Sequence, residues 1–159
     1  MVEYTPAYLA DIVVADNAST DGSIEYFSSL EGILFVESGG NIGFGRANNL
    51  GYKYSSGRYL LMLNSDTILE NDVLSRMVHH FDQQPDDVAC LGSLLVHADR
   101  KPSCSFGYYV DWREEFGFNV TKGSTTIISG SQEVVEYVSG ADLFVRRSVV
   151  EQYGLFDPD

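Results

Sequence analysis

Three short clusters of oxygen- and amide-bearing side chains stand where apolar runs of the sequence end. They are Asp16-Asn17-Ala-Ser19-Thr-Asp21, Asn41-Ile-Gly43 and Asn64-Ser-Asp66. Carboxylate and amide oxygens can hold Mg²⁺ or Mn²⁺ together with substrate phosphates, and a carboxylate can accept hydrogen bonds from a base or a ribose. The clusters therefore predict a metal–diphosphate clamp at Asn64 and Asp66, and a nucleoside contact at Asp16.

Local structure offers a second explanation for each cluster. Asp16 can close an Asx turn or cap the following helix, and Asn64–Asp66 can form a capping turn before a helix near residue 70. The stretch "NIGFG" (41–45) matches neither common phosphate-loop pattern, so it can be a turn that needs a positive φ. Both explanations remain open for all three clusters.

The apolar runs before the clusters are predicted to be buried parallel strands. They cover residues 11–16, 33–38 and 58–66, and a segment with helical spacing of apolar residues follows each one. This alternation is typical of a parallel sheet with helices on both faces. Ligands bind such sheets at the carboxyl ends of the strands, so the three clusters are expected to converge on one edge.

Later segments follow a weaker pattern. Residues 88–96 favour a fourth strand, whereas residues 97–132 indicate a long excursion or a small antiparallel element. Strand character then returns, with a short helix from about Ser148. The whole chain, 1–159, is interpreted as one domain, in which 11–96 form a nucleotide-binding half and 97–159 an acceptor-side part.

The overall composition restricts the class of partner. The 23 acidic and 10 basic residues give a formal net charge of −13, so a nucleic-acid backbone would be repelled. A small diphosphate can still bind through a divalent cation. No apolar run approaches the ~18 residues of a membrane span, and no signal peptide is predicted at the N-terminus.

Other reactive or aromatic side chains have ordinary interpretations. Cys90 and Cys104 are expected to be idle free thiols of a reducing cytoplasm, and the histidines show no zinc-ligand spacing. Tyr108, Tyr109 and Trp112 form either a platform for a sugar ring or part of the core.

Four segments, in this order, resemble the motifs of family-two glycosyltransferases of the GT-A fold. They are "IVVADNASTDGS", "GGNIGFGRANNLGY", "YLLMLNSDTIL" and "VSGADLFVRRSVVEQYGLFD". Within the family, the chain most resembles bacterial rhamnosyltransferases of surface-polysaccharide synthesis. The resemblance implies a Rossmann-like α/β fold with a mainly parallel sheet. It also implies inverting transfer of a sugar, with rhamnose a candidate, from a UDP- or dTDP-linked donor to a glycan or lipid-linked acceptor.

The resemblance also implies a nucleotide pocket. Asp16 corresponds to the family aspartate that contacts the uracil or thymine base. The residues expected to shape the pocket or to flank the nucleotide are Asn17, Ser19, Asp21, Asn41, Gly43 and Asn48.

A metal site and a sugar site follow from the same resemblance. Asp66 would be the ligand of Mg²⁺ or Mn²⁺ in the family's DxD position, with Asn64 in the place of the first acid. The segment beside the donor sugar and the acceptor would be Gly140, Ala141 and Asp142, followed by the positively charged pair Arg146 and Arg147.

Two departures from the family pattern concern the ends of the chain. "MVEYTPAYLAD" does not match the first family strand, and neither Asp157 nor Asp159 matches the acidic motif that carries the catalytic base. We therefore expect an incomplete domain, truncated at both ends, whose catalytic base is unknown. The alternative function is a non-catalytic module that binds nucleotide-sugars. A cytoplasmic location is expected, with the inner face of the membrane as one option, and the oligomeric state is left open.

Overall fold

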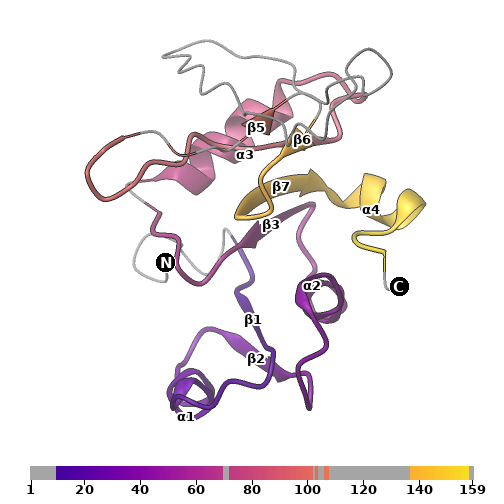
Figure 1. Ribbon diagram of the computed structural model, residues 1–159. Coiled ribbons are helices and arrows are strands. Elements are labelled where there is room, and N and C mark those ends of the chain that lie inside the picture. Colours follow the sequence, from indigo (N-terminus) through magenta and orange to yellow (C-terminus); the bar gives the residue numbers. More distant parts are fainter. Residues whose placement is uncertain (1–9, 70–71, 102, 104–105, 108–136, 158–159) are drawn as a thin grey trace, which may run out of the picture. The chain divides into compact units, whose positions relative to one another are not determined.

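The computed structural model describes residues 10–69, 72–101, 103, 106–107 and 137–157. The chain divides into two compact units, and each is described here by itself. The first unit consists of Met1–Leu60, Ile68–Ala89 and Val145–Asp159, and the second of Leu61–Thr67 and Cys90–Phe144. Figure 1 labels the helices and strands along the chain. The predicted division into halves at residues 96 and 97 stays a prediction.

The first unit begins with a strand–helix–strand segment. The strands β1 (Val13–Asp16) and β2 (Leu34–Glu37) pair in parallel, which confirms the expected direction with shorter bounds. They are connected by the short helix α1 (Ser23–Ser28), in keeping with the crossover that parallel strands require. Phe27 of α1 stacks on Phe35 of β2, with ring centroids 6.5 Å apart. This stacking fastens the helix to the strand pair.

The helix α2 (Phe44–Tyr52) lies against β1. A Cβ added at Gly51 would be 3.5 Å from the Cβ of Ala15 and 3.8 Å from a methyl group of Val13. Ala47 of the same helix is buried. Small residues on this face therefore let the helix backbone approach the strand closely, and the last turn of α2 lies against β1.

The strand β3 (Tyr59–Leu63) is shorter than the predicted run to residue 66. It ends where the N–H of Thr67 donates to the carbonyl of Asn64, because this hydrogen bond closes a β-turn. In the three-stranded sheet, β7 (Asp142–Arg146) lies between β3 and β4 (Cys90–Leu91).

The fourth predicted strand, residues 88–96, is wrong in extent, because β4 covers only Cys90–Leu91. The Asp142 carboxylate takes the backbone N–H of Ser93, a group that a longer strand would pair with its neighbour. A Cβ on Gly92 would lie 3.1 Å from the Cβ of Val138, so the backbone comes close to that residue here. Just after Leu91, the side chain of Asp142 therefore accepts the hydrogen bond that a neighbouring strand would otherwise accept.

Two further strands of the second unit, β5 (Phe106–Gly107) and β6 (Tyr137–Val138), pair antiparallel. The strand β5 falls within the range where an antiparallel element was expected. Tyr108, Tyr109, Trp112, Cys104 and Asp159 lie outside the described residues, so the interpretations placed on them stay predictions.

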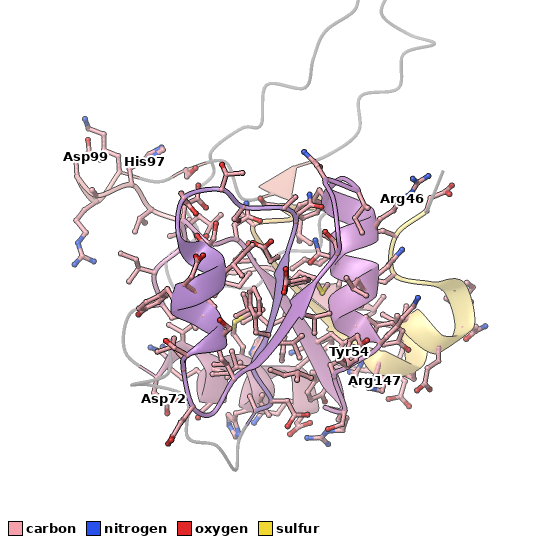
Figure 2. All side chains as sticks on the ribbon, turned by 90° about the horizontal axis from the view of Figure 1, so that it is seen from below. Arg46, Tyr54, Asp72, His97, Asp99 and Arg147 are labelled. Atoms are coloured by element: carbon pink, nitrogen blue, oxygen red, sulfur yellow. The ribbon has the colours of Figure 1, made fainter. Side chains whose placement is uncertain are left out.

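The helix α3 (Val73–Asp82) has its own N-terminal cap. The carboxylate of Asp72 accepts a hydrogen bond from the N–H of Ser75 at 3.3 Å, and Figure 2 shows Asp72 with the other described side chains. The capping explanation for Asn64–Asp66 is therefore wrong, because a later residue caps this helix.

The last helix, α4 (Arg147–Tyr153), begins one residue before the expected Ser148. Phe81 of α3 and Val150 of α4 are buried in the first unit, and Met62 and Phe144 are buried in the second. None of the helices in the described ranges combines the length and the apolar character that a membrane-spanning helix requires.

Candidate functional site

Asp16 ends β1 with a side chain that is only 7% exposed. Its Oδ2 accepts hydrogen bonds from the N–H groups of Ala18 at 3.0 Å and Ser19 at 3.1 Å. Hydrogen bonding from the Ser19 side chain lowers the pKa of Asp16, and with the two N–H groups it outweighs the opposing effect of burial. Asp16 is therefore an ionised carboxylate that closes an Asx turn at the end of the strand.

Ala18 in this turn has φ +70°, a left-handed conformation that costs about 1 kcal/mol for a residue with a Cβ. The N–H groups of Ala18 and of the next residue, Ser19, both donate to Oδ2 of Asp16, and these two hydrogen bonds maintain the conformation. The loop after β1 therefore has a defined shape.

The side-chain amide of Asn17 joins the loops that follow β1 and β2. Its Nδ2 donates to Oδ1 of Asn41 at 3.0 Å, and its Oδ1 accepts from the N–H of Ile42 at 2.8 Å. Oδ1 of Asn41 also accepts from the N–H of Gly43 at 3.1 Å. Two of the three predicted clusters thus meet in the first unit, because parallel strands bring their carboxyl ends together.

Gly43 is the N-cap of α2, with φ +84° and ψ 164°. This conformation is essentially restricted to glycine. The positive-φ explanation of "NIGFG" is therefore confirmed, and the backbone turns here directly after the Asn17–Asn41 contact.

Asp21 and Asn48, which were also expected to contact the nucleotide, form hydrogen bonds with residues close to them in the sequence. Asp21 accepts hydrogen bonds from the N–H of Ser23 at 3.1 Å and from its hydroxyl at 2.6 Å, and the Ser23 side chain lowers the pKa of Asp21. Asn48 donates from Nδ2 to the carbonyl of Phe44 within α2 at 2.9 Å. These contacts explain both residues as parts of helix starts and turns, and their expected nucleotide contacts stay predictions.

In the second unit, the Asn64 turn adjoins the segment that contains Gly140 and Ala141. The backbone N–H of Asn64 donates to the carbonyl of Ala141 at 3.1 Å. Gly140 and Ala141 form the turn between β6 and β7, and the N–H of Ala141 is held by the Ser139 hydroxyl at 3.2 Å. The expected metal turn and the expected sugar segment are thus neighbours.

Asp66 is exposed on this turn, and within the described ranges no residue donates a hydrogen bond to its carboxylate. Among the same residues, no three His, Cys, Asp or Glu side chains gather as a preformed metal cage. Mg²⁺ commonly uses one or two protein carboxylates and completes its shell with water and substrate phosphates. One uncommitted carboxylate and the neutral amide of Asn64 fit such a shared site.

Asp142 starts β7 with a side chain that is 2% exposed. Its Oδ2 accepts from the N–H of Ser93 at 2.6 Å and from the Ser93 hydroxyl at 2.5 Å, whereas Oδ1 has no partner among the residues that the structure describes. Burial raises the pKa of Asp142, although the Ser93 hydrogen bonds act in the opposite direction. This environment favours a supporting role for Asp142 over direct contact with a sugar.

A pH effect follows from Asp142. Because its pKa is raised on folding, the carboxyl stabilises the folded chain below the ordinary aspartate pKa of about 4 and loses that contribution as the pH rises through the raised value. We expect wild type to lose stability relative to Asp142→Asn between pH 4 and pH 8. Urea unfolding of both proteins across this range measures the difference. A difference that does not change with pH would contradict the raised pKa.

Arg146 closes the C-terminal end of α3, a role that sequence reasoning missed. Its Nη2 donates to the carbonyls of Phe81 at 3.3 Å, Gln84 at 3.2 Å and Pro85 at 3.2 Å, and its Nε donates to Val88 at 2.9 Å. Its guanidinium also lies 4.3 Å from the ring centroid of Phe81. The carbonyls of Phe81 and Pro85 also accept the backbone N–H groups of Gln84 and Val88, so the arginine adds charged donors to the end of α3 and to the turns that follow it.

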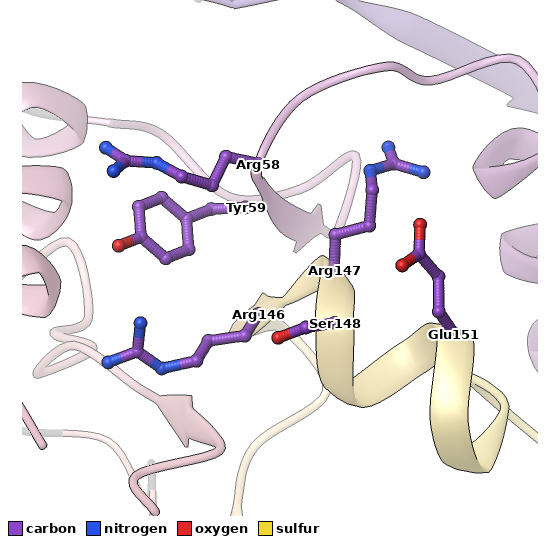
Figure 3. A pocket seen from close by; sticks show the side chains of 6 residues that line it. All are labelled: Arg58, Tyr59, Arg146, Arg147, Ser148 and Glu151. Atoms are coloured by element: carbon purple, nitrogen blue, oxygen red, sulfur yellow. The ribbon is translucent and has the colours of Figure 1, made fainter. Parts of the chain in front are cut away.

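The side chain of Arg147 also contacts other residues of the first unit. Its Nε donates to the carbonyl of Gly57 at 2.5 Å, its Nη2 donates to the Ser55 hydroxyl at 2.8 Å, and the guanidinium lies over Tyr52. Figure 3 shows the two arginine side chains leaving the start of α4 in different directions. A pocket of about 290 Å³ lies beside them and is lined by Arg58, Tyr59, Arg146, Arg147, Ser148 and Glu151. These contacts indicate that the pair organises the fold of the first unit.

The sequence profile described as glycosyl transferase family 2 matches residues 2–154. The chain belongs to glycosyl transferase family 2. Membership implies the GT-A fold, which agrees with the α/β class, the parallel β1–β2 pair and the helices around them.

Similar proteins of known name include the poly-beta-1,6-N-acetyl-D-glucosamine synthases of Staphylococcus aureus strains COL and N315. Each is 25% identical to this family 2 chain over 152 residues, which cover 94% of the chain and 35% of the relative. The chain thus spans about a third of the length of these relatives. No solved structure matches it.

Proposed function

We propose that this family 2 chain carries the donor-binding part of a glycosyltransferase that acts in cell-surface polysaccharide synthesis. The reaction is transfer of a sugar from a nucleoside diphosphate to a glycan or lipid-linked acceptor, with inversion. The observation that carries the proposal is the Asn17 bridge between the Asp16 loop and the Asn41 turn. It sets an ionised carboxylate and ordered amides at the edge where open α/β sheets bind ligands.

Each unit offers its own candidate contacts to a nucleotide-sugar. In the first unit, Asp16 and the bridged loops accept and donate hydrogen bonds to the base and ribose. In the second unit, Asp66 and Asn64 would be the residues that hold a divalent cation. A cation bound there supplies positive charge beside the departing diphosphate. The base that deprotonates the acceptor is unassigned in this proposal.

The donor is a UDP- or dTDP-linked sugar. Motif resemblance favours rhamnose, whereas the name of the S. aureus relatives supports N-acetylglucosamine. We therefore treat both sugars as candidates. We also propose a cytoplasmic enzyme that meets lipid-linked acceptors at the inner face of the membrane by peripheral association.

Isothermal titration with UDP and dTDP, with and without Mn²⁺, tests donor binding. Because Asp66 and Asn64 would hold a cation that offsets the charge of the diphosphate, we expect one nucleotide to bind about 100-fold more tightly with Mn²⁺, which corresponds to roughly 2.7 kcal/mol. Absence of heat at millimolar ligand in all four titrations would rule out the proposal.

A second measurement separates an enzyme from a non-catalytic binding module. The chain is incubated with UDP-N-acetylglucosamine or dTDP-rhamnose, with and without a glycan acceptor, and free nucleoside diphosphate is quantified. If the wild-type chain releases nucleoside diphosphate faster than the Asp66→Ala variant does, the result supports turnover. Nucleotide binding without release supports the binding module.

A further inference from the structure

Asn49 of α2 holds a segment that lies 107 residues further along the chain. Its Nδ2 donates to the carbonyl of Phe156 at 2.8 Å, and its Oδ1 accepts from the N–H of the same residue at 3.1 Å. One side-chain amide therefore satisfies both backbone groups of Phe156, as a neighbouring strand would. Both hydrogen bonds are partly buried, so water competes for them less than on an open surface.

Two other residues of α2 add to this contact. The ring of Phe44 packs edge-on against the ring of Phe156, with centroids 5.5 Å apart. A Cβ added at Gly45 would lie 3.2 Å from the Cβ of Phe156, so glycine lets the segment approach the helix closely. Asn49, Phe44 and Gly45 thus fix Phe156 through hydrogen bonds, ring packing and close approach.

The same helix begins at the bridged loops. Gly43 caps α2, and its N–H is held by Asn41, which in turn accepts a hydrogen bond from Asn17. At the other end of this set of contacts, Gly154 with φ +83° ends α4, and the chain continues to Phe156. A continuous series of contacts within the first unit therefore connects the Asp16 loop with Phe156.

We propose that Asn49 is a positioning residue that fastens the segment 155–157 to α2 and couples its order to occupancy of the Asp16–Asn41 loops by a nucleoside diphosphate. This coupling rests on the proposed function, whereas the Asn49 contact itself does not. A nucleotide that rigidifies the loops at the start of α2 also restrains Phe156, and the Asn49 amide carries that effect.

Amide hydrogen exchange of the full 159-residue chain, resolved by residue with NMR, tests the contact. In Asn49→Ala the N–H of Phe156 loses its acceptor, and we expect it to exchange at least about tenfold faster than in wild type. Amides of β1 should be unaffected. The matched control is Asn48→Ala on the same helix, which should leave Phe156 exchange within about twofold of wild type. Equal Phe156 exchange in Asn49→Ala and wild type would overturn the proposal.

Gly45→Ala keeps the test decisive if Asn49→Ala does not fold. Alanine favours a helix over glycine, but its Cβ would press on Phe156 at 3.2 Å. We expect faster exchange at Phe156 while the rest of α2 exchanges as slowly as before. Unchanged exchange at Phe156 in this variant would also count against the contact.

The coupling is tested by repeating the exchange measurement with UDP or dTDP and Mn²⁺. We expect the nucleotide to slow Phe156 exchange at least about threefold in wild type and not in Asn49→Ala. Slowing of equal size in both proteins would overturn the coupling. If neither nucleotide binds wild type, the proposed function and the coupling fail together, while the Asn49 contact is still decided by the exchange rates without ligand.

Discussion

Arg146→Ala is expected to lower the free energy of unfolding by about 3 kcal/mol, since hydrogen bonds to charged groups contribute about 1.5–3 kcal/mol each and water replaces only part of them here. The substitution removes the donors to one carbonyl of α3 and to three carbonyls in the segment that follows it, and also the guanidinium that lies against Phe81. Urea unfolding measures the loss. If the unfolding free energy falls with urea concentration at the same slope in both proteins, they expose the same amount of surface on unfolding.

Arg58→Ala is the matched control for this prediction. Arg58 pairs with Asp82 at 2.9 Å, but its side chain is 69% exposed, and such surface pairs contribute about 0–1 kcal/mol. Arg146→Lys should recover about half of the stability or less, because an ammonium cannot reach the same set of carbonyls as a planar guanidinium. Losses of equal size in Arg146→Ala and Arg58→Ala would contradict the capping role of Arg146.

Asp66→Ala is expected to weaken nucleotide binding by about 100-fold in Mn²⁺, which corresponds to roughly 2.7 kcal/mol. The reason is that the variant loses the only carboxylate of the proposed shared metal site. Affinity without Mn²⁺ should stay the same. The urea midpoint should also stay the same, because the Asp66 carboxylate is exposed and accepts no hydrogen bond from the described residues.

The control for Asp66 is another exposed aspartate of the second unit. Asp99 pairs with Lys101 at 2.8 Å on a turn between His97 and Lys101, and Figure 2 labels Asp99 and His97. Asp99→Ala removes the same amount of charge, so it should leave Mn²⁺-dependent affinity within about twofold of wild type. If Asp66→Ala binds the nucleotide in Mn²⁺ as tightly as wild type does, Asp66 is not a ligand of the metal.

The sequence was informative where structure depends on near neighbours. The apolar run before Asp16 and the polar residues after it predicted a strand followed by a polar loop, although Val13, Val14 and Ala15 are only partly buried and not fully buried as expected. The meeting of Asn17 with Asn41 then followed from one rule, that parallel strands end at the same edge. The Asp72 cap was also predictable, since it lies directly before the helix that it caps.

Contacts between distant residues were not predictable in this way. Asn49 and Arg146 bind backbone groups of Phe156 and Phe81, 107 and 65 residues away. Backbone carbonyls and N–H groups are present at every position and leave no mark in the sequence, so no local pattern points to them. For the same reason the apolar run 88–96 suggested a long strand, although the Asp142 carboxylate, 49 residues after Ser93, takes the N–H that would have continued it.

The left-handed Ala18 has a consequence for affinity. Fixing the backbone of one residue costs about 1–2 kcal/mol of conformational entropy. In the loop after β1 this cost is met during folding, because the Asp16 carboxylate already holds the N–H groups of Ala18 and Ser19. A ligand that docks on this loop finds it preorganised. The left-handed conformation of Ala18 thus lowers folding stability slightly, and in exchange a ligand that binds this loop loses less conformational entropy.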